Sequence, residues 1–394
     1  MWWLGFLFHD IAFGLLSIFL PLYVITVGGS LVDIGLMTAI AVFLAIPFSY
    51  FWGYVSDRTR HYKICVLISF LGLAVLLYLF TLVTNVESLI ILFGAMSIFH
   101  VAHEPTKNIM IAEWFSRSQW EAAFASYEGF TEIGTFAGLL LGLFMSLYGF
   151  GATNTLLLCC ILNLIAFVVS LFLVTDPNLI FERSLVRIEN AANFAYRGII
   201  LASKMWNGLR ISKELKKENL YAFCSGLVLF SLATSIFYTP LPIFFSKELE
   251  LSEDFVFAVF LLNSGGEALG YFLIRRETLR GRGKSRLCKV VMFRSILVFL
   301  LILIVLKAAY TSLMSMVILA LMGFAYALFI IYTLLLSMEL IPEGKSGLFN
   351  VMAGIGTACG AFIGPFLAEK AGFISVFLIT GVIFLLSYVA FKIT

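Results

Sequence analysis

Long apolar runs, separated by short stretches that carry charge, glycine, proline or asparagine, follow one another along the 394 residues of the chain. A run of about 20 apolar residues can cross the hydrocarbon core of a bilayer as a helix. Such runs are much longer than the roughly 10-residue alternating strands of a membrane barrel. The pattern therefore predicts twelve membrane-spanning helices, at residues 2–26, 31–52, 63–84, 88–113, 121–148, 153–174, 219–245, 254–274, 286–306, 312–340, 345–369 and 372–393.

Composition supports a lipid-embedded chain. Hydrophobic residues make up 61% of the sequence and charged residues 12%, whereas soluble domains average about half and about a quarter. The apolar run that begins at Met1 lacks the basic start and the small-residue cleavage site of a signal peptide. We expect this run to be the first span of an all-α membrane protein.

Several function classes have no motif in the sequence. The six cysteines are scattered through apolar segments without a CxxC pair, a pattern that predicts neither disulfides nor a cysteine zinc site. No GxxxxGK[ST] loop is present, so we expect no ATP-driven mechanism. Nothing in the sequence predicts a cofactor or a nucleic-acid partner.

Basic residues gather on one side of the predicted membrane. When the twelve spans are threaded through the bilayer, all of the 26 Lys and Arg residues except Lys247, Lys307 and Lys370 lie on one side or closer to it. Cytoplasmic loops are the ones enriched in basic residues. We therefore expect both termini on the cytoplasmic side of the plasma or inner membrane.

One connection is much longer than the others. Residues 175–218 hold eight Lys and Arg residues and place Ile188, Ala191, Ala195 and Ile199 at near-helical spacing. Basic amphipathic segments of this kind lie along a membrane surface. We expect an N-terminal six-helix bundle (1–174), a cytoplasmic amphipathic linker (175–218) and a C-terminal six-helix bundle (219–394), with a regulatory or lipid-sensing linker as the alternative.

The two sides of the linker resemble each other. Three features recur in order at offsets between 217 and 222 residues. The last of them is a set of glycines four residues apart, a spacing that lets helices approach closely in lipid. These features are Ser17 to Leu22 with Ser235 to Leu241, Gly53-Tyr54 with Gly270-Tyr271, and Gly134, Gly138 and Gly142 with Gly356, Gly360 and Gly364. The chain is therefore expected to be a parallel repeat of six helices.

The segment from Gly53 to Lys63 concentrates charge between two apolar runs. Its glycine, three residues, Asp57-Arg58 and further basic residues resemble the loop between helices 2 and 3 of the major facilitator superfamily. Together with the parallel six-plus-six organisation, this resemblance covers the whole chain. It implies a secondary transporter, not an enzyme, that moves a small solute by alternating access as a monomer in the bilayer.

The resemblance also assigns a gate. Gly53, Asp57 and Arg58 match the superfamily motif, and they imply a cytoplasmic latch near the start of helix 11 that holds the outward-facing state. Arg60 stands where the family has glycine, and Ile274 stands where the second copy would have aspartate. We expect an asymmetric gate, with a charged turn that only sets topology as the alternative.

Ionisable residues inside spans are costly and are functional hypotheses by default. Helix 4 carries four polar residues on one face by helical spacing, and Pro105 is expected to bend it there. In the superfamily, helices 1, 4, 7 and 10 line the transport path, so the resemblance places this face on it. The intramembrane set consists of Asp10, His100, His103, Glu104, Lys107, Glu128, Glu132 and Glu267.

Equal depth pairs residues of helices 4 and 5. The turn between them predicts that Lys107 faces Glu128 and that His103 faces Glu132 near the midplane. We expect Glu132, with His103 or Glu104, to carry protons, because a desolvated carboxylate and a histidine can both exchange protons near neutral pH. Asp10, Lys107 and Glu128 are expected to form a rearranging ion pair, and a static salt-bridge network is the alternative.

The solute is expected to meet both halves of the chain. Polar groups on otherwise apolar walls suit an amphipathic compound, and aromatic packing is the alternative for each residue. Export of such a compound and uptake of a small organic solute by symport both remain open. The expected substrate-binding residues are His100, Tyr238, Asn263, Glu267, Tyr326 and Tyr332.

Three further functions remain as alternatives. His100, His103, Glu104 and Glu132 have the ligand types that would suit a divalent-metal substrate, although no resident metal is expected. A membrane enzyme would have to use the same His and Glu face of helix 4. A scaffold or receptor would have no need of the titratable pairs.

Overall fold

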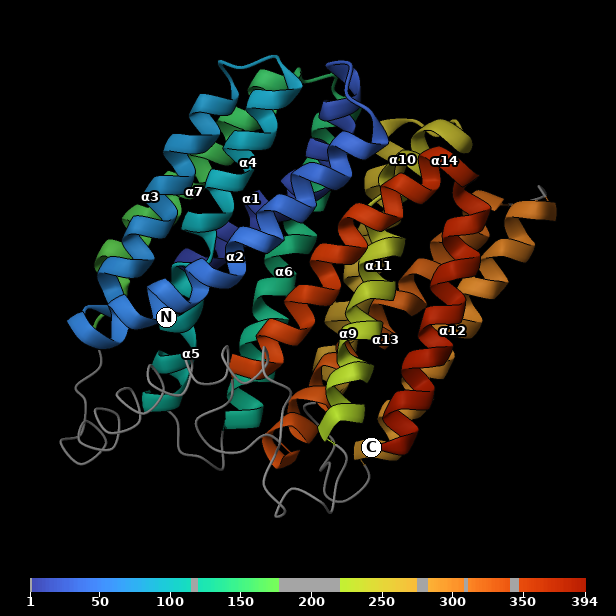
Figure 1. The fold of residues 1–394 in the computed structure, drawn as a ribbon. Helices are drawn as coiled ribbons and strands as arrows, with labels where there is room; N and C mark the ends of the chain where they lie inside the picture. Colours follow the sequence, from blue (N-terminus) through green and yellow to red (C-terminus); the bar gives the residue numbers. More distant parts are fainter. Residues whose placement is uncertain (1, 115–119, 177–219, 275–282, 308–310, 341–346) are drawn as a thin grey trace.

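The computed structural model describes residues 2–114, 120–176, 220–274, 283–307, 311–340 and 347–394. Helices make up this part of the chain, with no strand among the described residues, and they run side by side between two ends of the molecule (Figure 1). They are α1 (Leu4–Thr26), α2 (Leu31–Thr59), α3 (Tyr62–Phe80), α4 (Val86–His100), α5 (His103–Trp114), α6 (Trp120–Leu147), α7 (Ala152–Leu173), α9 (Leu220–Tyr238), α10 (Leu241–Ile243), the π-helix η3 (Phe244–Glu248), α11 (Glu253–Ile274), α12 (Gly283–Lys307), α13 (Thr311–Leu340) and α14 (Gly347–Ile393).

Ten helices of the described residues are long and apolar enough to cross a membrane. One of them, α14, has 47 residues and a non-helical residue at Gly372. At 1.5 Å per residue it is about 70 Å long, more than twice the core of about 30 Å, so it turns back at Gly372 as the pattern predicted. The prediction of an all-helical membrane protein is confirmed, whereas the number of twelve crossings stays a prediction.

The charged segment after Gly53 is helical, which corrects the prediction of a loop that begins there. Helix α2 continues to Thr59 and ends at Arg60, whose φ is 57° and whose N–H donates to the carbonyl of Ser56. Helix α3 begins at Tyr62, so only two residues separate it from Thr59. The end of the apolar run shows where the chain leaves the membrane, but the backbone hydrogen bonds of the helix continue beyond that point. The helix therefore extends past the predicted span.

The predicted fourth span is broken rather than bent. Helix α4 ends at His100, α5 begins at His103, and two residues without helical assignment join them. The reason is Pro105, which has no N–H to donate to the carbonyl of Val101 four residues earlier. The polar residues of this span therefore lie on two short helices.

Prolines also shape the start of the C-terminal half. The predicted seventh span divides into α9, the single turn α10 and the π-helix η3, which ends at Glu248. Pro240 and Pro242 lie at the break, where each removes a backbone donor. The helical path is thereby offset next to α1, which α10 contacts.

The glycines predicted to allow close approach do so in both halves. A Cβ at Gly138 of α6 would lie 2.0 Å from the carbonyl oxygen of Ile11 in α1. A Cβ at Gly360 of α14 would lie 2.5 Å from the carbonyl oxygen of Leu232 in α9. The internal repeat is thus also a repeat of backbone packing. Gly142 departs from it, because it faces the Phe257 ring of α11.

The two halves meet mainly along two helix pairs, α2 with α14 and α6 with α11. In the first pair, the Val32 N–H donates to Glu369 at 3.2 Å and Ile46 faces Gly354. In Figure 1 the blue helix α2 and the red helix α14 approach each other at the end opposite the marked chain termini. The predicted linker, apart from residues 175 and 176, lies outside the described residues.

Candidate functional site

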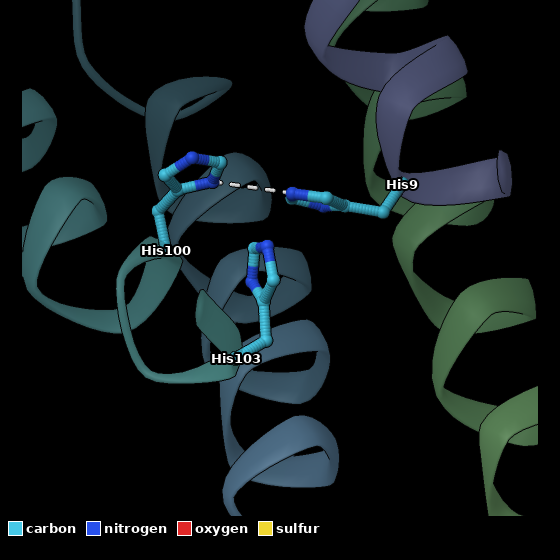
Figure 2. Close-up of side chains that lie close together, drawn as sticks. All are labelled: His9, His100 and His103. Atoms are coloured by element: carbon cyan, nitrogen blue, oxygen red, sulfur yellow. Dashed lines mark hydrogen bonds between the residues drawn. The ribbon is translucent and has the colours of Figure 1, made fainter. Parts of the chain in front are cut away.

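Three histidines converge between α1, α4 and α5. His9 lies on α1, His100 is the last residue of α4 and His103 is the first residue of α5, so the helix break places two of them opposite the first. Figure 2 shows the three rings pointing toward one another. The His9 Nε2 and His100 Nδ1 atoms are 3.1 Å apart, and His9 and His103 are buried. We refer to these three residues as the histidine cluster.

Polar neighbours hold two of these rings from behind. The Asn163 amide donates to the carbonyl of Cys159 at 3.0 Å, which leaves its oxygen to accept from His9 Nδ1 at 2.9 Å. Behind His103, the Nδ1 atom lies 3.1 Å from the Ser69 hydroxyl. Because Nδ1 of His9 carries the proton in the neutral ring, its Nε2 atom offers a lone pair to the cluster.

An ion network adjoins the histidine cluster. The Lys107 ammonium lies 2.9 Å from Glu104 and 3.5 Å from Glu128, and it sits 5.0 Å from the centre of the Tyr127 ring. His103 Nε2 lies 3.6 Å from Glu104. The structure thus places Lys107 beside Glu128 as the depth argument predicted. We refer to Glu104, Lys107 and Glu128 as the Lys107 network.

Asp10 lies beside this network without joining it. Its Cβ faces Gly134 of α6, and its Oδ2 atom is buried without a hydrogen-bond partner among the described residues. No ion pair of Asp10 occurs in this part of the chain. The predicted three-residue ion pair is therefore present only as Lys107 with Glu128.

The predicted approach of His103 to Glu132 is absent from the described contacts. Glu132 instead accepts a 2.5 Å hydrogen bond from the hydroxyl of Ser264 in α11. Equal depth determines the height of a side chain but not its direction, and α6 lies between α1 and α11. Glu132 consequently links the N-terminal and C-terminal halves of the molecule.

The candidate residues of the C-terminal half form a second polar group. The Tyr238 hydroxyl donates to Asn263 at 2.8 Å, and the Tyr271 hydroxyl approaches Glu267 at 3.5 Å. Tyr332 is buried. Tyr238 and Asn263, which were predicted separately as substrate-binding residues, are therefore in contact, whereas His100 lies with the histidine cluster.

Arg294 of α12 is a residue that sequence reasoning missed. It is fully buried, and none of its three side-chain nitrogens has a hydrogen-bond partner within the described residues. Its guanidinium lies 4.9 to 5.8 Å from the ring centres of Phe230, Tyr238, Tyr326 and Phe384. In the sequence analysis Arg294 was counted with the basic residues of the cytoplasmic side and was therefore not treated as an intramembrane charge. The rule on ionisable residues inside spans, applied strictly, would have found both Arg294 and His9.

Comparison with protein families decides what kind of molecule carries these sites. The family model described as Major Facilitator Superfamily matches residues 2–348. The chain belongs to this superfamily. It is accordingly a multi-pass membrane transporter of small solutes and not an enzyme.

A curated protein matches part of this superfamily transporter. The "Multidrug resistance protein MdtG" of Dickeya zeae (strain Ech586) is 29% identical over 182 residues, which make up 44% of this chain and 43% of that protein. The match thus spans less than half the length of that relative. Its name describes that protein alone.

Solved structures match over the whole chain. The crystal structure of nucleoside transporter NupG has a TM-score of 0.71 at 15% identity and covers 99% of this chain and 97% of its own. A structure of proton-dependent oligopeptide transporters reaches 0.76 at 14% identity, with 98% and 94% covered. The human organic anion transporter MFSD10 (TETRAN) has 0.68 at 16%, with 99% and 97% covered. At these identities the likeness shows the fold alone.

The predicted gate of the superfamily transporter lies in the last two turns of α2. The Gly53 carbonyl accepts from the Ser56 hydroxyl, and Arg58 donates to the Tyr54 hydroxyl at 2.7 Å, so both described contacts stay within α2. The side chain of Asp57 and its expected neighbours at the start of the predicted span 345–369 lie outside the described residues. The latch therefore stays a prediction.

Proposed function

We propose that the chain is a proton-coupled secondary transporter that exports amphipathic solutes by alternating access. The observation that carries this proposal is the hydrogen bond between Glu132 of α6 and Ser264 of α11. It joins the two halves within the membrane, and its acceptor is a carboxylate whose bonding changes when it takes up a proton. A proton on Glu132 would thus alter a contact between the halves that have to move.

The C-terminal polar group supplies the second part of the proposal. Tyr238, Asn263 and Glu267 offer hydrogen bonds next to aromatic surface, which suits a solute with a polar group on an apolar body. The relative named as a multidrug resistance protein supports export rather than uptake. Uptake of a small organic solute by symport is the competing outcome.

Orientation and domain organisation belong to the proposal. The distribution of basic residues supports cytoplasmic termini and a cytoplasmic linker. The proposal also includes two bundles, 1–174 and 219–394, that act together as a monomer. With this orientation, the described contacts between α2 and α14 run from the outer end, where Val32 meets Glu369, to Ile46 and Gly354, which lie on the cytoplasmic side of the middle of both helices. A reporter fused to the C-terminus that is active only in the cytoplasm tests the orientation.

Proton coupling is tested in proteoliposomes that contain a pH-sensitive dye. A thermal-shift screen of amphipathic cations, anions and neutral compounds at two pH values first identifies a ligand, because bound solutes stabilise the protein by mass action. Adding this ligand should evoke proton movement with the wild type. Glu132→Gln should abolish the proton signal, and the control Glu87→Gln, at an exposed position, should retain it. Unchanged proton movement in Glu132→Gln would remove Glu132 from the mechanism.

A further inference from the structure

Three of the four histidines in the chain form the histidine cluster. Each offers one nitrogen such that the three nitrogens lie within 4.8 Å of one another. The rings come from three helices and converge on one point (Figure 2). The fourth histidine, His61, is exposed at the turn between α2 and α3. Imidazole nitrogens that converge on one point supply the type of ligand that transition-metal ions bind in proteins.

The groups behind the rings are those expected of a metal site. Metal-binding histidines usually donate their second ring N–H to an oxygen, which orients the ring and fixes its tautomer. His9 donates in this way to Asn163 at 2.9 Å, and Nδ1 of His103 lies 3.1 Å from the Ser69 hydroxyl. This leaves Nε2 of His9 to face the cluster, and in the second ring it leaves Nε2 of His103, which lies 3.6 Å from Glu104.

Distances between ligand atoms are close to those of a bound ion. Metal–nitrogen bonds of about 2.05 Å at tetrahedral angles separate two ligand nitrogens by about 3.3 Å. His9 Nε2 and His100 Nδ1 are already 3.1 Å apart. Binding requires His100 to shift its proton from Nδ1 to Nε2, which changes the tautomer without releasing a proton. It also requires His103 to move inward by roughly 1 Å, which the adjacent helix break can accommodate.

Charge near the cluster favours a cation. The Lys107 network holds two carboxylates and one ammonium, so it carries one net negative charge when all three groups are ionised. Glu104 lies 3.6 Å from His103 Nε2, next to the ligand position. His100 is only half-buried, so the cluster is not completely enclosed. Three imidazoles with an open fourth position suit zinc and neighbouring transition metals rather than magnesium or calcium.

We propose that the histidine cluster binds one divalent transition-metal ion of the zinc class and thereby ties α1 to the break between α4 and α5. The site differs from the sequence-based alternative, because it includes His9 and excludes Glu132. It does not depend on proton coupling or on the identity of the solute. A bound ion would restrain α1 against α4 and α5 and would act as a brake on transport.

The test uses purified full-length protein without a histidine tag, in a His61→Gln background that removes the exposed histidine. Titration with Co²⁺ should give one equivalent bound with the visible absorption of a tetrahedral site, and Zn²⁺ should displace it. His9→Gln should weaken Co²⁺ binding by at least about tenfold, and Asn163→Ala by about tenfold through loss of ring orientation. Equal binding in His9→Gln and in the His61→Gln parent would overturn the proposal.

A second measurement requires no change to the cluster. X-ray absorption of the Zn²⁺-loaded His61→Gln protein should show imidazole scattering from three rings. One ring or none would indicate adventitious binding elsewhere and would refute the site. A variant that unfolds would also lose metal binding. Only samples that are monodisperse in detergent are therefore compared.

Discussion

Replacing the packing glycines of α6 by alanine should have effects that differ sharply by position. At Gly138 a new Cβ would lie 2.0 Å from the carbonyl oxygen of Ile11, where ordinary contact begins at 3.4 Å. Both atoms belong to rigid backbone, so α1 and α6 must separate by more than 1 Å. At Gly142 the obstacle, at 2.2 Å, is the side chain of Phe257 rather than backbone, so less of the structure has to move. At Gly129 the nearest atom is at 3.5 Å, an ordinary contact.

These distances set the expected free energies. Overpacking costs about 1–3 kcal/mol when neighbours cannot move, and a gap of about 1 Å forfeits up to half of the dispersion energy across the rest of the contact. Alanine returns up to about 1 kcal/mol of helix propensity at each position. We expect Gly138→Ala to lose roughly 2 kcal/mol of unfolding free energy net and Gly142→Ala less. Gly129→Ala should be neutral or slightly stabilising.

A thiol-reactive fluorescent dye measures this order during thermal unfolding in detergent. Cys65, Cys159 and Cys160 are buried and free, so they react only when the helices separate. Gly138→Ala should unfold several degrees below Gly129→Ala. Equal Tm values for these two variants would refute the reasoning that backbone contact, rather than glycine itself, determines the cost.

Two further predictions concern the buried cations. Lys107→Met should lower the unfolding free energy by about 1–3 kcal/mol. The loss is smaller than for a fully buried ion pair because Glu104 and Glu128 are each about one-third exposed. Adding Glu128→Gln should recover part of the loss, and an unchanged Tm in the single variant would contradict the network. Arg294→Lys should be less stable than Arg294→Met by about 1–3 kcal/mol, because an ammonium is more strongly hydrated than a guanidinium and cannot stack flat among four rings. The reverse order in thermal unfolding would show that the aromatic cage holds any cation.

Local chemistry explains where sequence reasoning about the helices succeeded and where it did not. The positions of the apolar runs predicted most helices correctly. A chain segment in lipid has to form its own backbone hydrogen bonds, so an apolar run that crosses the membrane is helical. The apolar runs misplaced the end of α2, since Arg60 rather than the last apolar residue terminates the hydrogen bonding. Pro105 was expected to bend one helix, and the structure has a complete break between α4 and α5.

The candidate site was only partly predictable. Lys107 and Glu128 pair as their positions along two antiparallel helices require. Glu132 does not reach His103, because side-chain direction depends on how α6 rotates between its neighbours. His9 was overlooked although it lies inside the first predicted span, and its meeting with His100 and His103 depends on a helix break that had not been foreseen.

The sequence by itself determined the lipid-embedded helical fold, the parallel repeat with its glycine contacts, and the superfamily. The fold and the repeat follow from the order of apolar residues and glycines along the chain, and the superfamily follows from the motif of Gly53, Asp57 and Arg58 together with that repeat. Tertiary structure alone decided the meeting of three histidines, the bond from Glu132 to Ser264 and the enclosure of Arg294 among four rings. Each depends on the rotation of one helix against another, and that rotation is set by van der Waals packing over many residues rather than by any local pattern.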